Sequence, residues 1–367
     1  MEVILVTGSE RFLSRWVLKT LLAEHASAVL YLLAHPDYVV STQQFVDQLP
    51  DEQKVRCRVL SGAVLFMNLG LTSDQYRKLS RELTHVFHLS DEWNKAKGGR
   101  ALFRHNTEGT REVLELAGTC KNLERFCHLS TVLVSGTRTG VVMEDELDVG
   151  QGFGDAYQKS KFQAEKLVSR WMRRLPVTVV RSGLIVGHSK TGDLDADEPA
   201  FQLIARLIHP PRGIVTLPNG GRAPFHLVPV DYLARALVQL AFDEQGTSRV
   251  FHLTDPAPVA AKRFLDVVAS KMHRDGDVRL IPAAVARVLL RSGWLDRVVG
   301  VGPVFGMSYL ERMVFYNCQN ALSVLWLQGL RQEGFDAYAE VLVRAVRDRS
   351  SRGGGRSSSP QVTDPLA

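Results

Sequence analysis

Short apolar runs alternate with amphipathic stretches along most of the chain. The runs are typical of strands buried on both faces, and they lie at Val3–Val6, Ala28–Leu33, Val55–Leu60, Val86–Leu89, Phe126–Gly136 and Val250–Leu253. The stretches between them have apolar residues at helical spacing, and they include Phe12–Leu18, Ser41–Leu49, Ser73–Leu83, Asn106–Ala117, Asp155–Lys166 and Tyr232–Phe242. This alternation predicts an α/β fold with a doubly wound, parallel, Rossmann-type sheet, whose ligands bind at the carboxyl ends of the strands.

The rest of the chain is expected to form a smaller, mostly helical substrate lobe. Further helices are predicted at Phe201–Ile208, Ala261–Lys271, Pro282–Leu295, Val304–Phe315 and Phe335–Arg347. The Asp-rich stretch His188–Glu198 predicts a loop over a substrate cleft. We therefore expect a Rossmann-type sheet domain over 1–255 with loop insertions around 188–225, a helical lobe over 256–348, and a Ser/Gly/Arg-rich disordered tail over 349–367.

Composition and charge exclude several classes of protein. Of the residues, 45% are hydrophobic and 23% charged, and the net charge of +6 forms no basic stripe with interleaved aromatics, so no nucleic-acid partner is expected. There is no run of about 18 apolar residues and no charged leader before Val3, which predicts a cytoplasmic protein without a transmembrane helix or signal peptide. The scattered cysteines lack metal-ligand spacing and are expected to be free thiols, with no metal site.

Arginines interrupt the apolar stretch Pro282–Phe315. A basic amphipathic helix of this kind binds anionic membranes at their surface, so peripheral membrane contact is one interpretation. Packing of a C-terminal lobe onto the sheet domain produces the same pattern, and the sequence leaves both interpretations open.

The predicted helix Asp155–Lys166 carries the candidate chemistry. Tyr157 and Lys161 are four residues apart, so on a helix they share one face. A phenol has a pKa near ~10, and a neighbouring ammonium lowers that pKa by favouring the phenolate, which suits the tyrosine to acid/base catalysis. An exposed aromatic–cation pair gives the same spacing, so the pair alone is a weak signal.

The turn after the first strand is typical of a nucleotide-binding unit, in which backbone N–H groups at the start of a helix receive a pyrophosphate. Gly8 supplies the turn, but Arg11 and Ser14 stand at the second and third positions of the glycine fingerprint. Glu10 places a carboxylate beside the anion site. Taken alone, this loop is either a degraded cofactor site or an unrelated turn.

In combination, these residues and further motifs resemble the extended short-chain dehydrogenases/reductases. They are most similar to the branch that contains the fatty acyl-CoA reductases and the thioester reductase domains of synthetases, with a male sterility-type NAD-binding domain. The resemblance covers roughly residues 1–270 in collinear order. The motifs are Thr7-Gly8 with Phe12-Leu13, Leu69–Leu71, Val86–Leu89, Asn106 with Gly109-Thr110, Leu129–Thr131, Tyr157 with Lys161, Val180–Gly187, His188–Gly192 and Leu227–Tyr232.

The resemblance implies a role for each matching residue. Tyr157 is the expected catalytic acid/base, Lys161 the residue that lowers the tyrosine pKa and holds the nicotinamide ribose, and Thr131 the donor to the substrate carbonyl oxygen. Asn106 is expected to brace the central helix, although Thr131 and Asn106 also suit purely structural hydrogen bonds. The implied cofactor is NADP, with NAD as the alternative, bound by Gly8, Ser9, Glu10, Arg11, Phe12, Leu13, His35, Ala63, Val64, Ser90, Tyr157, Lys161, Ser182 and Leu184.

Departures from the family pattern cluster at the cofactor, while the catalytic trio is intact. Besides the changes in the glycine fingerprint, Glu10 stands where a small hydroxyl is usual. Ala63 replaces an aspartate near the adenine, and Ser182 replaces a proline. His35 stands where this branch has an arginine for the 2′-phosphate; it favours NADP slightly, and a surface histidine explains it as well.

The implied function is an NADP(H)-dependent oxidoreductase that reduces a carbonyl or acyl thioester of an apolar, fatty acyl-like small molecule, as in lipid metabolism. Two alternatives remain open. One is a dehydrogenase for a sterol or sugar hydroxyl, and the other is a non-catalytic Rossmann scaffold with an eroded cofactor site that acts as a binding or regulatory partner. By analogy with the family, a homodimer is expected through the helices that carry Asn106 and Tyr157.

Overall fold

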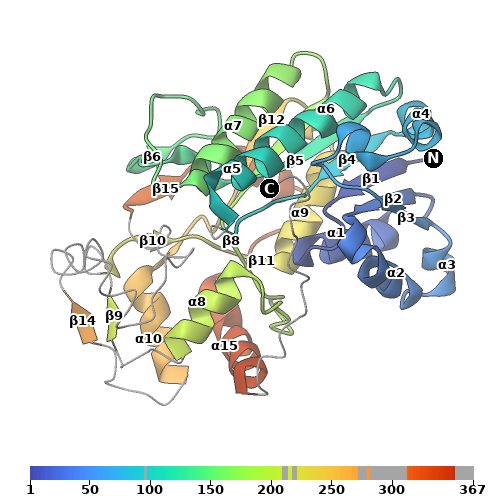
Figure 1. The fold of residues 1–367 in the computed structure, drawn as a ribbon. Coiled ribbons are helices and arrows are strands. Elements are labelled where there is room, and N and C mark those ends of the chain that lie inside the picture. The colour runs from blue at the N-terminus through green and yellow to red at the C-terminus, as the bar shows by residue number, and fades with distance from the viewer. Residues whose placement is uncertain (95–96, 209–213, 217–220, 272–278, 282–311, 352–367) are drawn as a thin grey trace. The chain divides into compact units, whose positions relative to one another are not determined.

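A large parallel sheet organises the first part of the chain (Figure 1). The structure is a computed structural model, which describes residues 1–94, 97–208, 214–216, 221–271, 279–281 and 312–351. The strands of the sheet are β1 (Val3–Thr7), β2 (Val29–Ala34), β3 (Cys57–Ser61), β4 (His85–His88), β5 (Arg125–Thr131), β7 (Val177–Ser182) and β12 (Arg249–Leu253). They pair in parallel in the order β12-β7-β5-β4-β1-β2-β3. The order reverses between β1 and β4, which confirms the predicted doubly wound, Rossmann-type fold.

Helices cover both faces of this sheet. Their bounds are α1 (Phe12–Glu24), α2 (Val39–Asp47), α3 (Asp51–Lys54), α4 (Ser73–Glu82), α5 (Gly98–Phe103), α6 (Gly109–Thr119), α7 (Ala156–Trp171) and α9 (Val230–Phe242). On one face α1 packs against α9, and on the other α6 packs against α7. Val3 and Leu5 of β1 belong to the apolar cluster that includes α6 and α7 residues, and Ile4 and Val6 are equally buried. Burial on both faces explains why continuous apolar runs mark the inner strands, whereas the edge strand β3 is only half-buried.

The chain divides into two compact units. Unit 1 comprises Met1–Ile185, His226–Pro258 and Arg312–Gln332, and it contains the large sheet. Unit 2 comprises Val186–Phe225, Val259–Glu311 and Glu333–Ala367. Its elements include α8 (Pro199–Ile208), β9 (Ile214–Thr216), β10 (Pro224–Phe225), β13 (Val259–Ala260), α10 (Ala261–Lys271), β14 (Arg279–Ile281) and α15 (Phe335–Ser351). The core of unit 2 is aromatic, with the ring of Phe264 at 4.8 Å from that of Phe225 and 5.2 Å from that of Phe335.

Two predicted element boundaries were wrong. Strand β5 ends at Thr131, and a 3-10 turn, η5 (Val132–Ser135), takes over from it. The chain then turns at Gly136, which has a φ of +60°. A Cβ at this position would lie 2.1 Å from the Gly152 carbonyl oxygen, so only glycine fits here. At the other end, α15 continues to Ser351 and so includes the first residues of the expected tail.

A third correction concerns the predicted helix Val304–Phe315. Val314 and Phe315 lie in a strand, β15 (Val314–Tyr316), which pairs in parallel with β6 (Gly140–Val142). The earlier part of that helix, the predicted helix Pro282–Leu295 and residues 352–367 lie outside the described residues.

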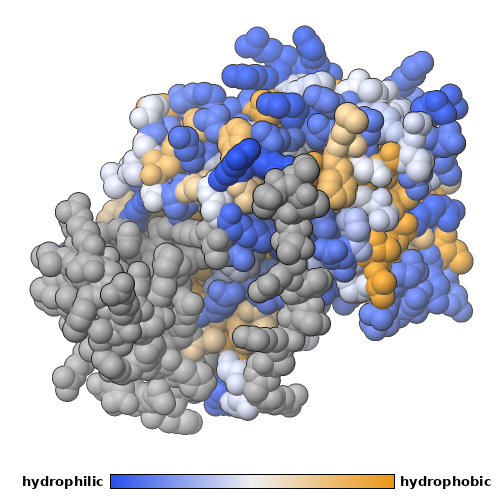
Figure 2. Space-filling view, in the orientation of Figure 1, coloured by the Kyte–Doolittle hydropathy of each residue, from blue (hydrophilic) through white to orange (hydrophobic). Residues whose placement is uncertain are grey.

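The surface of the described parts is mainly polar. Hydrophilic residues predominate on the face shown in Figure 2, as the amphipathic helix patterns predict. Among the helices that the structure describes, none is long and apolar enough to cross a membrane.

Candidate active site

The loop between β1 and α1 lies at the point where the strand order reverses, and its backbone is shaped by Gly8. This residue has φ +67°, and a Cβ here would lie 2.7 Å from the Cα of Ser90, which follows β4. Arg11 N donates to Gly8 O at 3.0 Å, which closes a tight turn before α1 begins at Phe12. The Ser9 hydroxyl donates to Leu33 O at 3.1 Å and so ties the loop to β2. The loop therefore has the tight turn into a helix that a nucleotide-binding unit requires.

Of the side chains that replace the usual small residues of this loop, Glu10 and Ser14 are packed inward and Arg11 is partly exposed. Glu10 has one carboxylate oxygen, Oε2, that is buried and without a hydrogen-bond partner among the described residues. Burial raises the pKa of this carboxyl, and the Arg11 guanidinium, 3.9 Å from Oε1, partly opposes that effect. Arg11 also lies 3.9 Å from Glu92 Oε2. The fully buried Ser14 stands where a glycine would allow close helix–sheet packing, and it is small enough to be accommodated.

Residues from several strand ends line one cavity beside this loop. It leaves about 20 Å³ of free space, and its lining consists of Gly8, Glu10, Leu33, His35, Gly62, Ala63, Val64, Ser90 and His105. Six of these residues were predicted from the sequence as cofactor ligands, and the structure brings them together. Leu33, Gly62 and His105 were missed. Leu33 sits inside an apolar strand and Gly62 in a turn, and His105 belongs to a helical segment far along the chain.

His35 at the end of β2 has an acidic neighbour that the sequence analysis did not consider. Its Nδ1 atom accepts from Asp37 N at 3.3 Å and lies 3.4 Å from Asp37 Oδ2. Its ring lies 6.0 Å from that of Phe66. A carboxylate this close offsets any positive charge that His35 offers to a 2′-phosphate.

The start of α7 places Tyr157 and Lys161 on one side of the helix. Asp155 caps α7 by accepting from Gln158 N at 2.9 Å, which fixes the first turn. Both functional side chains are almost completely buried and meet the same carboxylate, since Tyr157 Oη donates to Asp91 Oδ2 at 2.9 Å and Lys161 Nζ lies 3.5 Å from Asp91 Oδ1. Lys161 also donates to Leu129 O of β5 at 3.0 Å. Asp91 was not among the predicted site residues.

Thr131 and Ser182 lie side by side at the carboxyl edge of the sheet. They are register partners in β5 and β7, and both are buried. Thr131 Oγ1 accepts from Leu133 N at 3.3 Å, so its hydroxyl has a structural role at the start of η5. Leu184 follows in strand β8 (Leu184–Val186), also buried.

Asn106 connects this edge to α7. It lies in a short π-helical segment, η4 (Arg104–Glu108), of a kind that is frequent at functional sites. Its Nδ2 donates to Glu92 O at 2.8 Å and to Ser160 Oγ at 3.0 Å, and its Oδ1 accepts from Glu92 N at 2.8 Å. Ser160 Oγ in turn donates to Tyr157 O at 2.8 Å. Asn106 thus fixes the segment after β4 relative to the helix that carries Tyr157.

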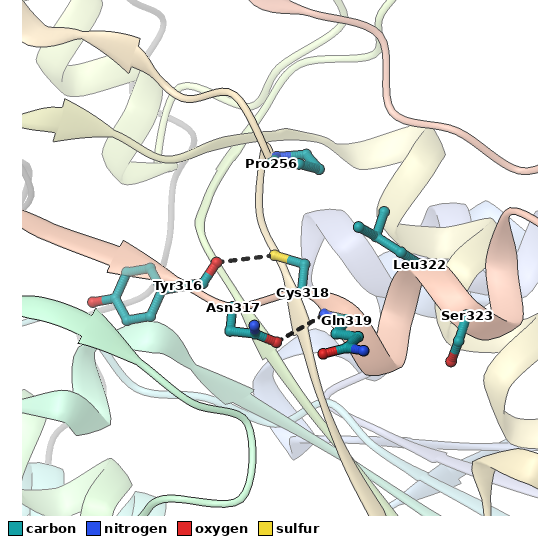
Figure 3. Close-up of a pocket in the computed structure, with 7 residues that line it drawn as sticks. All are labelled: Pro256, Tyr316, Asn317, Cys318, Gln319, Leu322 and Ser323. Carbon is teal, nitrogen blue, oxygen red and sulfur yellow. Dashed lines mark hydrogen bonds between the residues drawn. The ribbon is translucent and has the colours of Figure 1, made fainter.

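Other reactive groups carry no comparable chemistry. The cysteines are free thiols, and burial raises the pKa of Cys127 to about 12 and of Cys57, Cys120 and Cys318 to about 11. A shallow hollow of about 470 Å³ in unit 1 is lined by Pro256, Tyr316, Asn317, Cys318, Gln319, Leu322 and Ser323 (Figure 3). The Cys318 thiol in this hollow donates to Tyr316 O at 3.4 Å. It therefore has a structural partner, and we do not place the proposed reaction at this hollow. The described residues contain no cluster of potential metal ligands.

Comparison with known proteins identifies a family. The family described as male sterility protein, an NAD-binding domain, matches residues 6–237, which is more than half of the chain. Glycine betaine reductase ATRR from Emericella nidulans is 29% identical over 273 residues, which cover 70% of this chain and 21% of that protein. The carboxylic acid reductase of Segniliparus rugosus is 26% identical over 331 residues, which cover 81% of this chain and 27% of that protein. The chain therefore spans only a minor part of these curated relatives.

A solved structure extends the similarity to nearly the whole chain. The terminal R domain of the myxalamid PKS-NRPS biosynthetic pathway aligns with a TM-score of 0.80 at 25% identity, covering 95% of this chain and 91% of that domain. The likeness thus includes unit 2 as well as the sheet.

Proposed function

The chain belongs to the male sterility protein family of NAD(P)-binding extended short-chain dehydrogenases/reductases, and from this premise we propose that it reduces a carbonyl or acyl thioester of an apolar small molecule. The observation that supports the proposal best is the meeting of Tyr157, Lys161 and Asp91 between α7 and the carboxyl edge of the sheet. A fatty acyl-like substrate is the finer form of this proposal. Relatives named as reductases of acids and as R domains of synthetases support the class of reaction.

The residues present fit a nicotinamide dinucleotide. Gly8 lets the loop backbone pack closely against Ser90, since a Cβ here would lie only 2.7 Å from the Ser90 Cα, and the loop runs into the N-terminus of α1, which is the arrangement that receives a pyrophosphate. Glu10 is the loop residue least suited to a pyrophosphate, because its carboxylate would repel the phosphates. Burial raises the pKa of this carboxyl and so disfavours its ionised form. We propose that the Gly8–Leu13 loop holds the pyrophosphate and Lys161 the nicotinamide ribose. When bound, the reduced nicotinamide supplies a hydride.

Tyr157 is the proposed proton donor. Its hydroxyl is fixed by a hydrogen bond rather than exposed to solvent, which orients the donor in advance. Thr131 is proposed to hold the substrate carbonyl oxygen, because it lies at the end of the neighbouring strand. A buried site of this kind excludes water and so strengthens the polar contacts with the substrate.

NADPH is proposed as the preferred form of the cofactor, with His35 at the 2′-phosphate. The contact of His35 with Asp37 works against this preference because the pair is neutral when the imidazole is protonated. We therefore expect NADPH and NADH to bind with affinities that differ by less than about tenfold, equivalent to about 1.4 kcal/mol.

The proposal is tested by Tyr157→Phe. Loss of the general acid is expected to lower the turnover number about 10²- to 10⁴-fold while NADPH affinity stays within about twofold. Turnover of acyl thioesters and aldehydes gives the first quantity, and calorimetry gives the second. Tyr76→Phe on α4 is the matched control and should leave both unchanged. A Tyr157→Phe variant with the wild-type rate contradicts the assignment.

A second candidate function is a non-catalytic scaffold. Two carboxylates favour it, since Glu10 repels phosphate when ionised and Asp91 engages Lys161, the proposed contact of the ribose. Titration with NADPH and NADH separates the two candidates. Absence of binding of either at millimolar concentration supports the scaffold, and saturable binding of one supports the reductase.

A further inference from the structure

Asp91 is the side chain around which the proposed catalytic pair is arranged. It follows β4 by three residues, and its carboxylate accepts from Tyr157 Oη at 2.9 Å on one oxygen and lies 3.5 Å from Lys161 Nζ on the other. Its side chain is 24% exposed, whereas that of Lys161 is 3% exposed. Oδ1 is itself buried and has no hydrogen-bond partner among the described residues, so Asp91 is a partly exposed carboxylate in contact with a buried phenol.

The charge of Asp91 acts on Tyr157 in the direction opposite to that of Lys161. A carboxylate next to a phenol disfavours the phenolate, because two negative charges would be adjacent. The Lys161 ammonium favours the phenolate, but it is shared between Asp91 and the carbonyl of Leu129. Part of the positive charge that would stabilise a phenolate is therefore compensated by Asp91 itself.

The other titratable groups packed around this site add little charge. Burial lowers the pKa of His88 on β4 and of His105 on η4 to about 3, and that of His128 on β5 lies well below its usual value. These imidazoles are neutral at physiological pH. Asn106 and Ser160, on η4 and α7, are uncharged.

The remaining charges beside Asp91 form a separate group. Glu92 lies 2.6 Å from Lys97 and 3.9 Å from Arg11, and Arg11 also faces Glu10. The members of this group pair with one another, whereas Asp91 contacts the phenol directly and Lys161 contacts Asp91.

We propose that Asp91 keeps Tyr157 in its protonated, proton-donating form and returns a proton to it from solvent in each cycle. This role rests on the proposed reductase function, because a carbonyl reduction requires a proton donor. Tyr157 passes its proton to the substrate oxygen as that oxygen gains the electron pair displaced by the hydride from the reduced nicotinamide. The Asp91 carboxylate takes a proton from water, which leaves as hydroxide, and passes it to the phenolate, so that Tyr157 is again protonated and Asp91 again ionised.

The decisive experiment measures the ionisation of Tyr157 without cofactor or substrate. The near-ultraviolet absorbance of tyrosinate is titrated in the wild type and in Tyr157→Phe, and the difference isolates Tyr157. The same pair of titrations is made on an Asp91→Asn background. Removing the negative charge should shift the midpoint of Tyr157 ionisation to lower pH by about one pH unit or more. An unchanged or higher midpoint overturns the proposal.

Two further variants sharpen this test. Glu92→Gln removes the adjacent carboxylate, which pairs with Lys97 and Arg11, and should leave the midpoint within about a few tenths of a pH unit. Asp91→Ser also removes the charge, and should reproduce the shift if the asparagine variant folds poorly. A shift of equal size in Glu92→Gln argues against a specific role for Asp91.

The relay is tested by turnover. Asp91→Ala should lower the turnover number at alkaline pH, and added formic acid or another small carboxylic acid should restore part of it, which a purely structural role does not predict. No rescue, with a normal fold, contradicts the relay. Because the tyrosinate titration needs neither ligand, its result is independent of whether the chain is a reductase.

Discussion

The buried environment of Glu10 disfavours the ionised form of its carboxyl. Burial raises the pKa of its carboxyl, and the nearest cation, Arg11, is 3.9 Å away and also faces Glu92. An ionised carboxylate with a buried, unpartnered oxygen is costly, and a phosphate nearby would increase the cost. The neutral acid therefore suits both the folded loop and the proposed pyrophosphate.

We predict that Glu10→Gln stabilises the protein at alkaline pH. Since the folded-state pKa of Glu10 is raised above 4.5, its contribution to stability is full below pH 4.5 and is lost as pH rises through the folded pKa. Glutamine is neutral throughout, so the variant should exceed wild type by about 1 kcal/mol in free energy of unfolding near pH ~8 and by little near pH ~4.5. Urea unfolding at both pH values measures this gap.

A gap that does not grow with pH contradicts this account of Glu10. Glu52→Gln on α3 is the control, since Glu52 is exposed. The same Glu10→Gln substitution should strengthen NADPH binding about tenfold near pH ~8 if the loop holds the pyrophosphate.

At this scale the sequence reveals unusual residues but not their partners. Arg11 stands out because it breaks a glycine fingerprint, and Glu10 because it stands where a small hydroxyl is usual. Asp91 does not stand out, because its partner Tyr157 lies 66 residues further along the chain and no local pattern links them. Which side chain a loop carboxylate will meet depends on tertiary packing.

Helix α7 is joined to the sheet by a buried ion pair. Arg181 of β7 donates to Glu165 Oε1 through Nε at 2.8 Å and Nη2 at 2.6 Å, and Ser130 donates to Oε2 at 2.6 Å. Both charged side chains are almost completely buried. Glu165 lies on the helix that carries Tyr157 and Lys161, and Arg181 lies on β7, so the pair holds the proposed catalytic face against the sheet.

We predict that breaking this pair destabilises the protein strongly. Glu165→Ala leaves the Arg181 guanidinium buried without its carboxylate, and it should lower the free energy of unfolding by about 3–5 kcal/mol. Replacing both residues by methionine removes both charges, so that variant should be more stable than Glu165→Ala by at least about 2 kcal/mol. Urea unfolding ranks the variants, and a double variant no better than Glu165→Ala contradicts the electrostatic explanation.

Six of the seven strands of the sheet could be predicted from their apolar runs, and the seventh, β7, was not among them. Arg181 is a charged residue within that strand, and only the structure shows that Glu165 compensates it. Strand β15 could not be predicted, because Val314–Tyr316 is too short for a periodic signal and its partner Gly140–Val142 lies far away in sequence.

On the scale of the whole molecule, all the residues proposed to contact the cofactor fall within unit 1, in its segment Met1–Ile185. Residues 226–258 and 312–332 return to that unit after the chain has passed through unit 2. The assignment of these two later segments to unit 1 depends on tertiary contacts, which no local sequence pattern encodes. The arrangement nevertheless makes a prediction about where a ligand will act.

We predict that NADPH slows backbone hydrogen exchange mainly in unit 1. At a concentration of about 100 times Kd, binding adds at most about 2.7 kcal/mol, so the best-protected amides should exchange up to about 100-fold more slowly. The effect should be concentrated at Gly8–Leu13, Ser90–Asp91 and Tyr157–Lys161. Adenosine 2′,5′-bisphosphate lacks the nicotinamide ribose, so it should protect the residues near His35 but not Tyr157–Lys161. Protection confined to unit 2, or equal protection of Tyr157–Lys161 by both ligands, contradicts the proposed placement of the dinucleotide.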